Sequence, residues 1–208
     1  MIWATLANIP VEQLLTFVIG GLLLNLAPGQ DVFFASTCGI QGGPKAGAMA
    51  GLGVGLGGLC HVILVALGLG AVVAAHPGAL VAIKYAGAGY LLYLAWKSWT
   101  AREVRADAPV MTRAWDRVRK GMIINLLNPK PALFLLAFLP QFTRPEYGPV
   151  WQQLLGLGLI YVVTGTFITS GYGVIAGYAG QMLGKRLGIM NKIAAVLFAG
   201  LAVRLVTK

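Results

Sequence analysis

The sequence predicts an all-α integral membrane protein, and three observations lead to this prediction. Of the 208 residues, 58% are hydrophobic and only 11% are charged, whereas soluble domains carry about 25% charged residues. The stretches 14–27, 46–75 and 154–179 contain no Asp, Glu, Lys or Arg, and about 20 apolar residues suffice to cross a bilayer as a helix. The period-two alternation of a β-barrel is not visible, so helices are the remaining way to span the membrane.

Apolar stretches bounded by Gly, Pro and charged residues predict about six transmembrane helices. They lie near 12–38, 46–75, 81–99, 119–142, 150–180 and 188–206. The last is the weakest, because Asn191, Lys192 and Arg204 limit its uncharged part to 193–203, and a five-span alternative stays open. We expect a single transmembrane domain over 1–208, with one half at about 1–99, a polar, solvated loop at about 100–118 and a second half at about 119–208.

The basic residues predict how these spans are oriented. Eleven of the sixteen Lys and Arg residues follow the first, third and fifth spans, and seven of these eleven fall between 97 and 120. The opposite side holds only Lys84, Arg144, Arg204 and Lys208. Because Lys and Arg favour cytoplasmic loops, we expect the loop at about 100–118 in the cytoplasm and both termini in the periplasm. The chain is then a multi-pass protein of the bacterial inner membrane. This distribution accounts for the net charge of +10 without a nucleic-acid partner.

The second span repeats small residues at Gly43, Gly47, Gly51 and Gly55. Small residues let helix backbones approach closely within lipid, so we expect close helix packing rather than a phosphate-binding loop, which would need a following Lys-Ser or Lys-Thr. His61 lies in the same span, and a packed histidine is favoured over a metal ligand because metal sites recruit several ligands. We predict no metal and no other cofactor.

Two spans contain a proline break flanked by polar residues. Proline removes a backbone donor and clashes with the preceding turn, so each helix should be interrupted there. The two breaks are about 100 residues apart with three predicted spans per half, which predicts a 3+3 inverted repeat whose first and fourth helices are broken near the membrane centre. The residues at the breaks are Asn25, Pro28, Gly29 and Asp31 in the first span and Asn125, Asn128, Pro129 and Lys130 in the fourth.

These eight residues are the candidate substrate-binding or coupling residues, because paired interruptions in two halves mark transport sites. Asp31 is the only acid well inside the apolar regions, and it is either a transport carboxylate or a group that stabilises the start of a half-helix. Lys130 could pair with Asp31, bind a substrate carboxylate or extend to the membrane interface. The asparagines could bind a ligand or repair broken backbone bonds, and Asn128 before Pro129 matches a helix N-cap.

Together these features resemble the LysE/RhtB family of small amino-acid exporters, in its branch with a Pro-Gly-Pro-Asp motif. The resemblance rests on the first break at 27–31, the glycine-spaced second span, the stretch 84–94, and 125–142 with its Asn-Pro-Lys. Gln30 stands where the family usually has its second proline. The resemblance implies efflux of homoserine-, threonine- or leucine-type, polar or basic amino acids from the cytoplasm. Proton coupling and a homo-oligomer stay open.

Two other functions compete with this one. An exporter of metal ions would favour a His- or Cys-rich segment, which this chain lacks, and an exporter of other small polar metabolites stays an open alternative. A membrane-embedded enzyme is disfavoured, because the sequence has neither Gly-x-Ser-Gly around Ser170 nor His-Glu-x-x-His. We therefore predict a transporter and not an enzyme, with a small molecule and membrane lipid as its partners.

Overall fold

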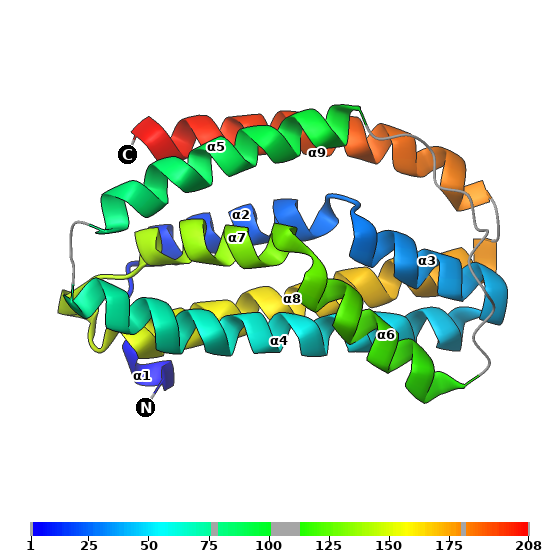
Figure 1. The fold of residues 1–208 in the computed structure, drawn as a ribbon, viewed down its shortest axis with the longest axis horizontal. Coiled ribbons are helices and arrows are strands. Elements are labelled where there is room, and N and C mark those ends of the chain that lie inside the picture. Colours follow the sequence, from blue (N-terminus) through cyan, green and yellow to red (C-terminus); the bar gives the residue numbers. More distant parts are fainter. Residues whose placement is uncertain (1, 76–78, 101–112, 180–181, 208) are drawn as a thin grey trace.

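The computed structural model describes residues 2–75, 79–100, 113–179 and 182–207, which form helices and turns without any strand (Figure 1). The first half contains α1 (Ile2–Ala7), α2 (Val11–Leu26), α3 (Gln30–Gly42), α4 (Pro44–Ala75) and α5 (Ala79–Trp99). The second half contains α6 (Ala114–Leu127), α7 (Pro129–Phe138), the 3-10 helices η1 (Leu139–Phe142) and η2 (Pro145–Tyr147), α8 (Val150–Ala179) and α9 (Met182–Thr207). The prediction of an all-helical membrane protein is confirmed.

Two boundaries differ from the sequence prediction. The short helix α1 was not predicted, because six residues are too few to give an apolar-length signal. The helix α6 begins at Ala114 rather than near 119, with Asp116 in its first turn, where a negative charge favours the helix dipole. The polar loop is therefore shorter than expected, and its residues 101–112 lie outside the described ranges.

Four predicted spans coincide with helices of suitable length and apolarity. Both α4 and α8 could cross a bilayer alone, and two bent pairs, α2 with α3 and α6 with α7 and η1, could cross if each counts as one span. The third and sixth predicted spans coincide with α5 and α9, which are not among the candidate spans found in the described residues. The count of six and the inverted orientation of the halves therefore stay predictions.

The surfaces of α4 and α8 are apolar on the side that faces away from the rest of the chain. Leu64 and Leu67 on α4 are each 66% exposed, and Phe167 on α8 is 75% exposed. Large apolar side chains in contiguous exposed positions need a nonaqueous neighbour. Such exposed apolar positions are typical of helices that span a membrane.

One helix of each bent pair, α2 and α7, runs through the interior of the bundle (Figure 1). Figure 1 shows α5 and α9 side by side along one face, α4 and α8 along the opposite face, and α2 and α7 between them. A single large hydrophobic core joins these layers, with Phe17, Phe134 and Phe198 among its fully buried side chains. Pro28 and Asn128 at the two breaks are buried in this arrangement, whereas Pro129 is exposed.

Glycines in α4 allow its close contact with α8. A Cβ added at Gly47 would collide with the Gly173 backbone, and one at Gly51 would collide with the Ser170 backbone. The close-packing prediction is therefore confirmed for these positions. Gly43 has a different role, because it precedes α4 and adopts a φ of 79°, a region that favours glycine.

Candidate functional site between the two helix breaks

The first break separates α2 from α3, which are bent by 52° relative to each other. The residues between them are extended around Pro28, so the carbonyls at the end of α2 lose their helical donors. Two side chains from the second half of the chain replace these donors. The Tyr172 hydroxyl donates to Leu26 O at 3.0 Å, and Lys130 Nζ donates to Ala27 O at 2.7 Å.

The second break separates α6 from α7, which are bent by 53°. Asn128 Oδ1 accepts a hydrogen bond from Lys130 N at 3.0 Å, and Pro129 takes the first position of α7. The predicted N-cap followed by proline is thus confirmed, as is the interruption of both helices.

His61 completes the backbone hydrogen bonding at this second break. Pro129 has no N–H with which to reach Asn125 O in the helical pattern, and His61 Nε2 lies 3.0 Å from that oxygen. A carbonyl oxygen only accepts hydrogen bonds, so Nε2 carries the hydrogen. His61 is buried, as expected for a packed histidine. Within the described ranges, no group of three His, Cys, Asp or Glu residues could hold a metal ion.

The two breaks meet at Asp31, in the first turn of α3. Its Oδ2 accepts hydrogen bonds from Asn125 Nδ2 at 2.9 Å and from Asn128 Nδ2 at 3.0 Å. Its Oδ1 is buried without a hydrogen-bond partner, and so is Asn125 Oδ1. Buried acceptors without donors are costly, so this centre is suited to receiving hydrogen-bond donors from a ligand.

Lys130 lies on the other side of the same centre. Besides its bond to Ala27 O, its ammonium lies 5.5 Å from the centre of the Phe198 ring on α9. Attraction between opposite charges couples it to Asp31. The side chain therefore crosses to the first half of the chain, and the alternative in which it extends to the membrane interface is wrong.

The other predicted residues line or form the breaks. Asn25 Nδ2 donates to Tyr161 O at 3.1 Å and to Thr164 Oγ1 at 3.3 Å, both on α8. Gly29 has an extended backbone, and a Cβ added there would lie 3.5 Å from Lys130 Nζ. Pro28 and Gly29 therefore shape the first break and bring no polar side chain to it.

Two small cavities adjoin this centre. Their volumes are about 30 Å³ and about 40 Å³, which suits a few water molecules. Both are lined by Asn25, Asp31, Pro131, Tyr161 and Thr169. Sequence reasoning missed the α8 residues Tyr161, Thr169 and Tyr172. The available signal was the series of hydroxyl-bearing residues along an otherwise apolar span.

Comparison with known proteins assigns the chain to a family. A family model described as LysE type translocator matches residues 22–208. The chain is 33% identical to an uncharacterized membrane protein of Vibrio cholerae over 93% of this chain and 96% of the relative. It is 32% identical to a homoserine/homoserine lactone efflux protein of Salmonella typhi, over 90% and 92% respectively. It is 28% identical to a leucine efflux protein of Klebsiella pneumoniae, over 97% and 98%.

No solved structure matches the chain. The family match covers most of the sequence, and it agrees with the apolar helices. The chain therefore belongs to the LysE type translocator family and is a multi-pass membrane transport protein, not an enzyme.

Proposed function

We propose that this protein exports small amino acids from the cytoplasm across the bacterial inner membrane. The single observation that supports this most is the polar centre at which Asp31, Asn125, Asn128 and Lys130 meet between two broken helices. Relatives similar over nearly the whole chain are named as efflux proteins for homoserine and homoserine lactone or for leucine. A neutral amino acid is therefore the cargo class we favour.

The chemistry of the centre fits a zwitterion. An α-ammonium group could donate to the unpartnered Asp31 Oδ1 and to Ala27 O in place of Lys130. The displaced Lys130 ammonium would then be free to bind the α-carboxylate. Charge-assisted hydrogen bonds of this kind are stronger than neutral ones, and the low dielectric of a membrane interior increases their strength further.

The size of the cavities implies that the two halves must separate for transport. Cavities of about 30 Å³ and about 40 Å³ cannot hold an amino acid, because small-molecule sites usually measure about 300–1,000 Å³. The hydrogen bonds between the breaks would be exchanged for bonds to the substrate as the centre opens. Alternating exposure of a central site in this way is typical of secondary transporters.

Coupling to protons is the finer part of this proposal and rests on Asp31. A carboxylate that is buried beside an ammonium and has an unpartnered oxygen can exchange a proton when the ammonium moves away. The metal-ion alternative has no comparable support, because among the described residues no cluster of metal ligands occurs.

Export by cells that express the chain or a variant tests the function. Cells loaded with labelled L-leucine or L-homoserine should lose label faster when they express the chain. Asp31→Asn should abolish this gain, because the amide keeps the size of the side chain but loses its charge and titration. The exposed Asp116 on α6 provides the matched control, and Asp116→Asn should export normally. Normal export by Asp31→Asn at equal membrane abundance would contradict a role for this carboxylate in transport.

A further inference from the structure

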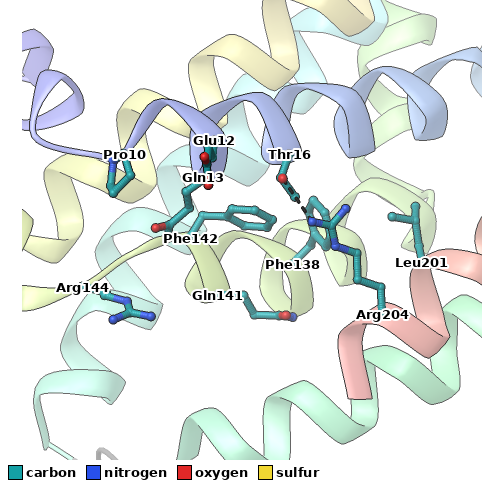
Figure 2. Close-up of a pocket in the computed structure, with 10 residues that line it drawn as sticks. All are labelled: Pro10, Glu12, Gln13, Thr16, Phe138, Gln141, Phe142, Arg144, Leu201 and Arg204. Carbon is teal, nitrogen blue, oxygen red and sulfur yellow. Dashed lines mark hydrogen bonds between the residues drawn. The ribbon is translucent and has the colours of Figure 1, made fainter. Parts of the chain in front are cut away.

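A larger cleft lies apart from the central site, between the start of α2, the end of α7 with η1, and the last turns of α9. Its volume is about 670 Å³, which falls within the usual range of small-molecule sites. Figure 2 shows the side chains that surround it. They are Pro10, Glu12, Gln13, Thr16, Phe138, Gln141, Phe142, Arg144, Leu201 and Arg204.

The lining of this cleft combines both charges with an apolar surface. Glu12 supplies a carboxylate, and Arg144 and Arg204 supply guanidinium groups. Phe138 and Phe142 give it apolar surface, and neutral amides and a hydroxyl complete the lining. A zwitterion with an apolar or hydroxylated side chain needs an anion for its ammonium, a cation for its carboxylate and an apolar contact for its side chain. The cleft offers all three.

Hydrogen bonds hold the walls of the cleft in place. Gln153 is fully buried, and its Nε2 donates to Arg144 O at 2.8 Å and to Gly148 O at 2.7 Å, while its Oε1 accepts from Arg144 N at 3.1 Å. Arg204 Nη2 donates to Thr16 Oγ1 at 3.1 Å and so joins α9 to α2 (Figure 2). The cleft is therefore defined by fixed backbone and by a contact between helices.

A continuous row of aromatic rings separates this cleft from the central site. The Phe138 ring lies 4.6 Å from Phe134, and Phe134 lies 5.3 Å from Tyr161, as measured between ring centres. Phe138 lines the cleft, whereas Tyr161 lines both central cavities. The tip of the Phe138 ring rests on Gly20, where an added Cβ would lie 2.7 Å from Cζ. These rings therefore form a chain of contacts from the cleft to the central site.

We propose that the cleft is a second amino-acid site, from which substrate leaves the protein, and that Phe138 is the gate between this site and the centre. This inference rests on the proposed export function. The positive-inside prediction places the cleft on the periplasmic side, since Arg144 and Arg204 belong to the side with few basic residues. Glu12 then binds the substrate ammonium, one of the two arginines binds the carboxylate, and the phenyl rings contact the side chain.

Protection of a cysteine in the cleft tests whether this second site exists. The full chain would carry Cys38→Ala and Cys60→Ala, which remove the two free cysteines, together with Gln141→Cys. With L-leucine or L-homoserine at about ten times its Kd, alkylation by a membrane-impermeant maleimide should slow about tenfold. Glu146→Cys, on the exposed η2 outside the cleft, should react at an unchanged rate.

The same measurement separates failure of this inference from failure of the export function. Protection that persists in the Asp31→Asn background would support a site independent of the centre. Normal export without any protection of Gln141→Cys would overturn the second site and leave the export function standing. Protection by phosphatidylethanolamine nanodiscs alone, with no further effect of amino acid, would assign the cleft to a lipid headgroup and also overturn the inference.

Transport by gate variants tests the role of Phe138. Phe138→Ala should leave the route open and allow labelled L-leucine to enter cells down its gradient, so uptake should rise several-fold while net export falls. Phe138→Leu retains most of the side-chain volume, so its uptake and export should be closer to those of the parent. It serves as the second variant if the alanine variant misfolds. Phe167→Ala makes the same change on the exposed face of α8 and should have no effect. Unchanged uptake and export in a folded Phe138→Ala variant would overturn the gate.

Discussion

Replacement of Lys130 by methionine should weaken the contact between the two halves of the protein. The Lys130→Met side chain retains a similar length but loses the ammonium. That ammonium donates to Ala27 O at 2.7 Å, lies 5.5 Å from the Phe198 ring and attracts Asp31. The variant therefore leaves a backbone carbonyl without its donor and the Asp31 carboxylate without the ammonium that attracts it.

The expected loss of stability follows from these two defects. An unpaired buried acceptor costs about 1–3 kcal/mol, and removal of one partner from a buried charge pair costs about 3–5 kcal/mol. The two costs are not added, because the cost of breaking the charge pair already includes groups that are left unpaired. We therefore expect Lys130→Met to lower the free energy of unfolding by about 3–5 kcal/mol. The double variant with Asp31→Asn has no unpaired buried carboxylate. Its free energy of unfolding should therefore fall by only about 1–3 kcal/mol, the cost of the unpaired carbonyl.

A double-mutant cycle on the purified full chain measures this difference. Reversible unfolding in mixed micelles with increasing dodecyl sulfate would give the free energies of the parent, the two single variants and the double variant. Lys120→Met, at an exposed position of α6, controls for loss of a lysine. If the double variant loses as much stability as the sum of the single variants, the two charges are not coupled and this account of the centre is wrong.

Two further predictions concern packing and orientation. Gly47→Ala should lower stability and membrane abundance because its Cβ would collide with the Gly173 backbone, whereas Gly68→Ala, where nothing lies within 4 Å, should match the parent in abundance and in unfolding. Alkaline-phosphatase fusions should be active after Lys208 and inactive within 101–112, because the distribution of basic residues predicts a cytoplasmic location for that loop. The opposite pattern of activity would reverse the predicted topology.

The helix breaks could be predicted from the sequence because their cause is local. Pro28 and Pro129 each remove a backbone donor, and a proline beyond the first turn of a helix kinks or breaks it for this local reason. The capping role of Asn128 was equally local, since an N-cap depends on the residues that directly follow it. That the two breaks face each other followed from the spacing of the two motifs and the number of spans between them.

The partners that repair the breaks could not be predicted in the same way. Tyr172 and His61 donate to carbonyls of helices distant in the chain, and nothing in their local sequence identifies the acceptor. A tyrosine or histidine in an apolar span needs a polar partner. The choice among several free carbonyls depends on the relative rotation and depth of the helices, which apolar length does not determine.

The outer cleft could not be predicted from the sequence either, because three segments that are distant in the chain form it. Glu12, Arg144 and Arg204 each lie close to a predicted span end, where charged residues normally face water or lipid headgroups. Each residue alone therefore fits an ordinary interfacial position. Only the packing of α2 against α9 and η1 brings opposite charges into one cleft with the same phenyl rings. Since the binding groups come from separate segments, disrupting the Arg204 contact with Thr16 should weaken amino-acid binding in the cleft and leave binding at the central site unchanged.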